Sequence, residues 1–300
     1  MNYLRRIYNT ITRDRWEIGF VEGGLNSVME CSEGLKVNWL RHNYKDRWFA
    51  DPFVLEVTES EIVVLVEEYL YSTGKGRIAE LIIDRNSYVL KELNVVLELN
   101  THLSFPAIRR EDSRVFVYPE SWLSGKLSLY EYEGRGREMK LVKVLCGEPM
   151  ADAIMTERFG KKTLLSTKEN DKLRFYDYHS ETECFVFSKE KEFDSATARN
   201  AGDFFEYKGK SYRPAQVCIN CYGEAIEIQE VTKQGEDNLL FSPIRRLYSP
   251  HAKLKSGMHT LNSYKGVTVV DVHGWVNPLT VNSIIKLKEL VLGKKWKRRK

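Results

Sequence analysis

The chain has 300 residues, of which 42% are hydrophobic, enough to bury the core of one large domain or two small ones. Its 46 basic and 42 acidic residues leave a net charge of +4, too mild to indicate a nucleic-acid partner. No segment approaches the roughly 20 apolar residues of a membrane-spanning helix, and the N-terminus lacks the apolar core of a signal peptide. We therefore expect a cytoplasmic protein, at most peripheral to a membrane.

The chain begins with a short amphipathic segment. Over residues 1–13, apolar side chains recur at helical spacing at Leu4, Ile7, Tyr8 and Ile11, which predicts a short helix. From about residue 36 to residue 280 the pattern changes to short runs rich in Val, Ile, Phe and Tyr, separated by charged or glycine-containing turns. Residues 127–132, Leu-Ser-Leu-Tyr-Glu-Tyr, alternate with a period of two, as half-buried strands do.

The last twenty residues, 281–300, return to a helical pattern and then become basic. Ile284, Ile285, Leu287, Leu290 and Val291 fall on one helical face. Six basic residues follow within the final seven positions: Lys294, Lys295, Lys297, Arg298, Arg299 and Lys300. We interpret this tail as a solvated chain end, with a weak membrane-surface contact as the alternative.

The five cysteines show no spacing typical of a disulfide framework. Cys218 and Cys221 form a C-x-x-C pair, but no second pair of cysteines or histidines follows it. We interpret all five as reduced cysteines, with metal or redox use as the less favoured alternative, and expect no metal and no cofactor.

An internal repeat is the most informative feature of the sequence. Five times, a small-polar-small opening precedes an apolar strand, and after a turn a second apolar strand returns. The opening positions are Asp51, Pro106, Asp152, Asn200 and Thr260, which lie 46 to 60 residues apart. A period of roughly 50 residues is typical of a four-stranded propeller blade. The sequence therefore predicts one all-β domain over residues 1–300: a five-bladed β-propeller over about 36–280 with short N- and C-terminal helical segments.

In a propeller, the innermost strand of each blade starts at the same mouth of the central axis at which the antiparallel second strand ends. Polar residues from five distant segments should therefore meet there: Asp51 with Glu67 and Glu68, Pro106 with Glu120, Asp152 with Thr167, Arg199 with Gln216, and His259 with His273. Taken singly, each aspartate has a simpler interpretation, since Asp often starts a turn. As an aligned set, they predict a polar site on the axis.

Several of these motifs, in this order, resemble the N-terminal domain of plant glucosamine inositolphosphorylceramide transferases and its bacterial relatives. The matching segments are 48–53 (Trp-Phe-Ala-Asp-Pro-Phe), 67–69 (Glu-Glu-Tyr), 118–121 (Tyr-Pro-Glu-Ser), 151–153 (Ala-Asp-Ala), 213–216 (Arg-Pro-Ala-Gln), 222–223 (Tyr-Gly) and 259–262 (His-Thr-Leu-Asn). The resemblance extends from about Trp16 to His273. That domain is in turn similar to the five-bladed arabinanase, levansucrase and invertase propellers, which cleave or transfer sugars.

The resemblance to these hydrolases implies roles for particular residues. Asp51 matches their first-blade base or nucleophile, and Asp152 matches the third-blade Asp that orients the sugar or maintains the pKa of the acid. Their general acid is usually a fourth-blade Glu, but here the segment 198–202 reads Ala-Arg-Asn-Ala-Gly and has no carboxylate. The plant transferases also carry a separate glycosyltransferase domain, and nothing in this chain corresponds to it.

Glycoside cleavage needs a carboxylic acid to protonate the leaving oxygen and a carboxylate to attack or to activate water. The candidate catalytic residues are Asp51, Asp152 and Glu120, with Glu68 as another candidate acid. The candidate sugar contacts are Trp48, Glu68, Arg199, Gln216 and His259, because planar polar groups and aromatic faces hold sugars. In simpler interpretations, Glu67 and Glu68 only pair with Arg47 or Lys75, and Trp48 belongs to the core.

Two functions are compatible with these residues. The first is a glycosidase- or transglycosidase-like propeller acting on a surface polysaccharide or a glycolipid precursor. The alternative is a non-catalytic saccharide-binding accessory domain for a glycosyltransferase. In both cases the expected partner is a saccharide or glycolipid, and no nucleic acid is expected.

Overall fold

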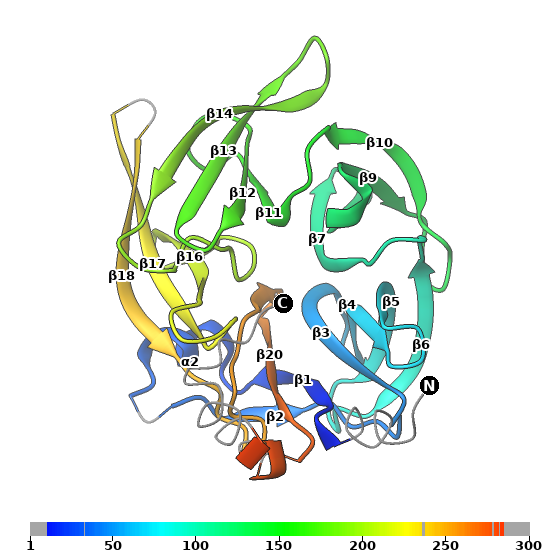
Figure 1. Ribbon diagram of the computed structural model, residues 1–300. Coiled ribbons are helices and arrows are strands. Elements are labelled where there is room, and N and C mark those ends of the chain that lie inside the picture. The colour runs from blue at the N-terminus through cyan, green and yellow to red at the C-terminus, as the bar shows by residue number, and fades with distance from the viewer. Residues whose placement is uncertain (1–10, 33, 236–237, 278, 282, 285–300) are drawn as a thin grey trace.

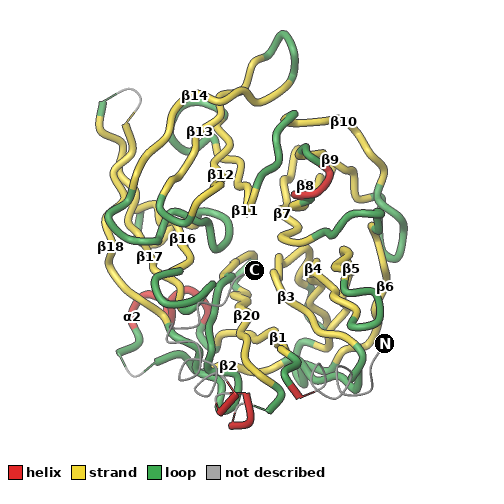
Figure 2. Tube along the Cα trace, in the orientation of Figure 1, coloured by secondary structure: helices red, strands yellow, loops and turns green. Residues whose placement is uncertain are grey.

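A computed structural model describes residues 11–32, 34–235, 238–277, 279–281 and 283–284 of the chain. Five four-stranded antiparallel sheets surround a central axis (Figures 1 and 2). This arrangement confirms the predicted all-β, five-bladed propeller. The helices expected over 1–13 and 281–300, and the basic tail, fall mostly outside the described residues. Within the described part of the chain, no helix is long and apolar enough to cross a membrane.

The first four blades each follow the chain from the axis to the rim. The first blade contains β3 (Arg47–Val57), β4 (Glu61–Leu70), β5 (Lys75–Asp84) and β6 (Leu90–Leu97). The second contains β7 (Ser104–Glu111), β8 (Arg114–Glu120), β9 (Leu127–Tyr132) and β10 (Lys140–Cys146). The third contains β11 (Ala151–Thr156), β12 (Thr163–Glu169), β13 (Lys172–His179) and β14 (Cys184–Glu192). The fourth contains β15 (Phe205–Tyr207), β16 (Lys210–Val217), β17 (Ala225–Gln234) and β18 (Asn238–Leu247).

The fifth blade is assembled from both ends of the propeller. Its inner strands are β19 (Leu261–Tyr264) and β20 (Val267–Trp275), and its outer strands are β1 (Asp14–Val21) and β2 (Val37–Trp39). A short helix, α2 (Gly24–Glu30), joins β1 to β2, and a 3-10 turn, η1 (Trp122–Ser124), follows β8. The propeller therefore begins at Asp14 rather than near residue 36. Pairing between β1 and β20 joins the two ends of the propeller within one sheet and so closes the ring.

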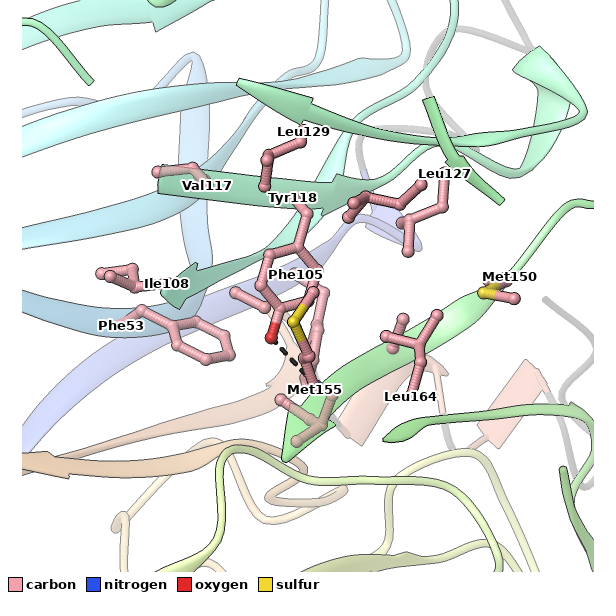
Figure 3. Packing of buried hydrophobic residues seen from close by; sticks show 14 of the residues in the cluster. Phe53, Phe105, Ile108, Val117, Tyr118, Leu127, Leu129, Met150, Met155 and Leu164 are labelled. Atoms are coloured by element: carbon pink, nitrogen blue, oxygen red, sulfur yellow. Dashed lines mark hydrogen bonds between the residues drawn. The ribbon is translucent and has the colours of Figure 1, made fainter. Parts of the chain in front are cut away.

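Apolar side chains fill the space between neighbouring blades, because alternate residues of each strand face the adjacent sheet. Figure 3 shows part of the largest core cluster, which extends from the first blade to the fourth. The rings of Phe53 and Phe105 meet edge to face at 5.0 Å, which joins the first blade to the second. The hydroxyl of Tyr118 accepts the N–H of Met155 at 3.0 Å, which joins the second blade to the third. The inner strands are thereby fixed relative to one another.

The contact between the fourth and fifth blades provides a test of this packing. Gly202 has a φ of +144°, and a Cβ there would lie 2.0 Å from the backbone oxygen of Leu261. We expect Gly202→Ala to lower the free energy of unfolding by about 2 kcal/mol or more, measured by urea denaturation, because backbone strain adds to a backbone clash. Gly209→Ala is the matched control, since Gly209 also has a positive φ but nothing lies within 4 Å of its Cβ position. Equal losses for both variants would contradict close packing at this contact.

Candidate functional site

Three inner strands carry the same backbone distortion at the residue that opens each repeat. Asp51 in β3, Phe105 in β7 and Asp152 in β11 have φ values of 51°, 46° and 46°. The strand pairing shifts register at each of them, as it does at a β-bulge. The equivalent of Asp51 in the second blade is therefore Phe105 and not Pro106, the position that the sequence repeat indicated. An L-residue rarely adopts a positive φ, so three equivalent cases mark a feature of the fold.

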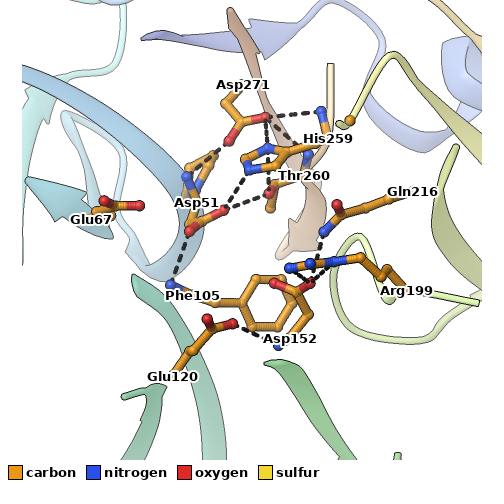
Figure 4. A network of polar contacts seen from close by, with 12 residues as sticks. Asp51, Glu67, Phe105, Glu120, Asp152, Arg199, Gln216, His259, Thr260 and Asp271 are labelled. Atoms are coloured by element: carbon orange, nitrogen blue, oxygen red, sulfur yellow. Dashed lines mark hydrogen bonds and ion pairs between the residues drawn. The ribbon is translucent and has the colours of Figure 1, made fainter. Parts of the chain in front are cut away.

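Each distorted residue donates its backbone N–H to a carboxylate of the preceding blade (Figure 4). The N–H of Asp51 donates to Asp271 at 2.9 Å, that of Phe105 to Asp51 at 3.0 Å, and that of Asp152 to Glu120 at 2.9 Å. The three carboxylates therefore join four consecutive blades, from the fifth through the first and second to the third. We call these contacts the carboxylate ties.

Asp51 belongs to a buried network with the fifth blade. Its Oδ1 accepts the hydroxyl of Thr260 at 2.9 Å and lies 3.4 Å from Nε2 of His259. Nδ1 of His259 lies 2.8 Å from Asp271. Burial raises the pKa of Asp51 to about 7; His259 opposes this rise, and the charges of Glu67, Asp271 and Asp152 add to it. Burial has the same effect on Asp271, but His259 and the backbone N–H donors outweigh it and lower the pKa of Asp271.

Asp152 is held by the fourth blade. Its Oδ2 accepts Nε of Arg199 at 2.7 Å, lies 2.5 Å from Nη2 of the same guanidinium, and accepts the amide of Gln216 at 3.0 Å. Burial opposes the charge of Arg199, but Asp152, followed by Tyr222 and Glu120, holds its pKa above the ordinary value. The ring of Tyr222 covers the guanidinium at 5.0 Å. The fourth blade thus supplies a fixed cation beside Asp152.

The structure brings six of the eight residues predicted for the site together at the axis: Asp51, Glu120, Asp152, Arg199, Gln216 and His259. With Thr260 and Asp271 they form what we call the axial cluster. Sequence reasoning missed Asp271, which lies in the apolar strand β20 and is fully buried. A lone acidic residue inside an apolar strand was the available signal, because a charged side chain is almost never buried without a partner.

Glu68 and Trp48 do not join the axial cluster. Glu68 is fully buried between two arginines, with Arg47 at 2.5 Å and Arg77 at 2.7 Å, so the simpler interpretation of its role as an ion-pair partner is confirmed in the first blade. Its neighbour Glu67 is the one that faces Asp51, whose pKa it raises. Trp48 is buried, stacks on Tyr69 at 4.5 Å, and is separated from His259 by Trp16.

Within the axial cluster, Asp51, His259 and Asp271 offer ligand atoms that all lie within 4.8 Å of one another, which is close enough to hold a metal ion. All three are already hydrogen-bonded or ion-paired to each other and to Thr260. A metal would have to replace these contacts, so the donor set is better explained by the network itself.

Solvent reaches only part of the axial cluster. Asp51 and Asp152 are 4% and 3% exposed, and Asp271 is fully buried. Glu120 and Arg199 of the cluster are partly exposed, and so is Tyr222, which covers the guanidinium; we call these three residues the axial mouth. A cleft of about 720 Å³ lies elsewhere, between the β2–β3 connection and β6. A ligand at the axis therefore meets Glu120, Arg199 and Tyr222 first.

Comparison with known proteins identifies the family. Residues 25–243 match the family described as "Glucosamine inositolphosphorylceramide transferase 1, N-terminal". The chain belongs to this family. Among its relatives are glucosamine inositolphosphorylceramide transferase 1 of Oryza sativa subsp. japonica, 25% identical over 232 residues, and that of Arabidopsis thaliana, 28% identical over 222 residues. The alignments cover 73% and 69% of this chain but only 30% and 28% of the two relatives.

Solved structures of similar fold are glycoside hydrolases. A GH43_1 enzyme from Xanthomonas citri superposes with a TM-score of 0.53 at 9% identity, covering 77% of this chain and 88% of the enzyme. The β-xylosidase/α-arabinofuranosidase CoXyl43 from a compost metagenome gives 0.52 at 10% identity, covering 77% and 92%. At such low identity the likeness shows the fold alone. The chain is thus a family member with a glycoside-hydrolase-like propeller.

Proposed function

We propose that this domain binds the sugar portion of a glycolipid or surface-polysaccharide precursor at the axial mouth, in support of a glycosyltransferase, and does not cleave glycosidic bonds. The relatives are named as transferases, and this chain spans about 30% of their length. The observation that carries the proposal is Arg199. The fourth blade supplies its guanidinium, bonded to Asp152, at the place where the similar hydrolases are expected to supply a general acid.

The remaining carboxylates support binding over cleavage. Hydrolysis requires one carboxyl that delivers a proton and another that is free to attack or to activate water. Here Asp51 and Glu120 each accept a backbone N–H from the next blade, and Asp152 accepts the guanidinium and an amide. These bonds stabilise the ring of blades and occupy acceptor sites that attack on a sugar by Asp51 would need.

The charge of the axial mouth favours an amino sugar. Five carboxyl groups lie in or beside the axial cluster, namely Asp51, Glu67, Glu120, Asp152 and Asp271. Facing them are the guanidinium of Arg199 and the imidazoles of His259 and His102, the last of which lies 3.2 Å from Glu67. A ligand that carries an ammonium group gains Coulomb energy in such surroundings, and partly exposed Glu120 is the group within its reach. The relatives' names include glucosamine, which agrees with this preference.

Calorimetric titration with glucosamine, N-acetylglucosamine and glucose tests the proposal. We expect glucosamine to bind most tightly and Glu120→Gln to weaken it at least tenfold, because the amide still accepts the N–H of Asp152 but no longer carries charge. Exposed Glu138, on the β9–β10 connection, provides the control Glu138→Gln, which should leave the affinity unchanged. Equal affinities for the three sugars, or an unaffected Glu120→Gln, would exclude the axial mouth as the binding site.

One observation favours the second candidate, a glycosidase: the pKa of Asp51, raised to about 7, suits a group that transfers a proton near neutral pH. A glycan panel assayed for released reducing sugar decides between the two functions. We expect no release by the wild type. Release by the wild type that disappears in Asp51→Asn would replace the binding proposal with the glycosidase.

A further inference from the structure

The junction between the fifth and first blades contains a cleft away from the axis. After β2, the chain crosses to the rim of the first blade, where the N–H of Arg41 donates to Tyr88 and that of Leu90 donates to Arg41, at 2.8 and 2.9 Å. These bonds form an isolated parallel bridge between Arg41 and Val89. Beyond this bridge the two segments part, and a cleft of about 720 Å³ lies between them. Figure 1 shows β2 and β6 as rim strands of neighbouring blades.

The charges that line this cleft are mostly positive. Arg15, Arg41 and Lys91 contribute three cations, and Glu92 is the acidic residue among the lining side chains. Glu92 pairs with Arg135 at 2.8 Å, outside the cleft, so its charge is already compensated. Exposed Arg41 forms no ion pair with any residue that the structure describes. An anion in the cleft would therefore find an uncompensated guanidinium.

The other two cations, Arg15 and Lys91, line the cleft and form ion pairs that leave their side chains partly exposed. Arg15 pairs with Glu17 at 2.7 Å and remains 41% exposed. Lys91 lies 3.3 Å from both Glu61 and Asp84 and remains 38% exposed. Such half-exposed ion pairs contribute little to stability, so their cations can reorient toward a ligand at small cost.

His42 shows that the positive charge acts inside the cleft. Burial, followed by the charges of Arg15 and Arg47, lowers the pKa of His42 to about 4, so its imidazole is neutral at physiological pH. Its Nδ1 accepts the N–H of Tyr44 at 3.2 Å, which places the ring proton on Nε2. His42 therefore lines the cleft as a neutral donor in a positive field.

We propose that this cleft binds the phosphoryl group of a phosphorylated sugar or polyol. A guanidinium binds phosphoryl oxygens through paired, charge-assisted hydrogen bonds, and Arg41 is available for them. The apolar side chains of Leu40, Val89 and Leu93, with the ring of Tyr44, line the same cleft and can contact the carbon skeleton. Its volume falls within the roughly 300–1,000 Å³ typical of small-molecule sites. The site is separate from the axial mouth and does not depend on it.

Two measurements distinguish a free sugar phosphate from a lipid head group. In the first, calorimetry compares glucose 6-phosphate, inorganic phosphate and glucose. In the second, co-sedimentation compares vesicles of phosphatidylcholine with vesicles that also contain phosphatidylinositol. We expect glucose 6-phosphate or the phosphatidylinositol vesicles to bind, and Arg41→Gln to weaken that binding at least tenfold. Arg137→Gln, at an exposed arginine on the β9–β10 connection, is the matched control and should leave it within twofold.

If calorimetry shows binding of glucose 6-phosphate that depends on Arg41, the ligand is a soluble sugar phosphate. If co-sedimentation shows Arg41-dependent binding to the phosphatidylinositol vesicles, the ligand is a lipid head group. Because Arg41 is exposed on the rim, Arg41→Gln should keep the wild-type melting temperature, which shows that a loss of binding is not a loss of folding. Binding of glucose as tight as that of glucose 6-phosphate overturns the proposal, as does the absence of any dependence on Arg41 in both measurements.

Discussion

Replacing Asp152 with alanine should lower the free energy of unfolding by about 3–5 kcal/mol, the cost of leaving one partner of a buried ion pair without its counter-charge. Asp152 is 3% exposed and accepts both the guanidinium of Arg199 and the amide of Gln216. Its removal leaves a largely buried cation beside the Gln216 amide, which keeps only its bond to the backbone oxygen of Asn200, at the point where the third and fourth blades meet. Urea denaturation, followed by tryptophan fluorescence, measures the change.

Two further variants separate this effect from the loss of a side chain. Asp177→Ala removes a carboxylate of the same blade that pairs with Lys161 at 3.1 Å near the surface, and it should cost less than about 1 kcal/mol. In the double variant Asp152→Ala/Arg199→Met the unpaired cation is gone, so its stability should exceed that of Asp152→Ala alone. If Asp152→Ala costs no more than Asp177→Ala, Asp152 is not committed to the ion pair and remains available for chemistry.

The arrangement of the axial cluster could be predicted from the sequence because propeller topology alone brings its residues together. The strand register agrees with this convergence, but the paired residues lie one or two positions before the predicted ones. Ala50 lies opposite Glu67, Ser104 opposite Glu120, and Ala151 opposite Thr167. In each case, the start of an inner strand meets the end of the second strand. The period of the repeat was therefore sufficient to select Asp51, Glu120, Asp152, Arg199, Gln216 and His259.

What could not be predicted depends on shifts of a single residue. Adjacent strand positions face opposite sides, so the choice between Glu67 and Glu68 requires the exact register, which the repeat does not define. The sequence repeat indicated Pro106 instead of Phe105 for a related reason. A bulge with positive φ is expected at glycine or asparagine rather than at phenylalanine, and nothing in the local sequence marks it.

The start of the propeller was missed because its closing strands are distant in sequence. The fifth repeat provides only two strands after Thr260, β19 and β20, and the missing two come from the opposite end of the chain. The period-two pattern of β1, with buried Trp16, Ile18 and Phe20, was the available signal. A propeller sequence with an incomplete last repeat predicts that its first strands complete the ring.

The second large effect concerns pH. Asp51 titrates at about 7 in the folded protein and at about 3.8 when unfolded, so between these values the folded state binds more protons. The contribution of Asp51 to stability should therefore fall as the pH rises from 4 to 7, by a few kcal/mol. Asp203 contributes in the same direction up to about pH 6, because burial raises its pKa to about 6. His42, whose pKa burial lowers to about 4 in the folded protein, opposes this fall below its ordinary value of 6.5. Asp271, whose pKa is lowered, likewise contributes with the opposite sign, and only near and below its ordinary value of 3.8.

Melting temperatures measured between pH 5.5 and 7.5 test whether stability falls as the pH rises. The wild type should melt at a higher temperature at pH 5.5 than at pH 7.5, and Asp51→Asn should flatten the profile, because asparagine still bonds to Phe105 and Thr260 but does not titrate. Glu181→Gln, at an exposed loop position, should leave the slope intact. A pH profile that Asp51→Asn leaves unchanged would mean that His259 keeps Asp51 ionised throughout. In that case, Asp51 is a permanent carboxylate tie and has no proton to deliver to a sugar.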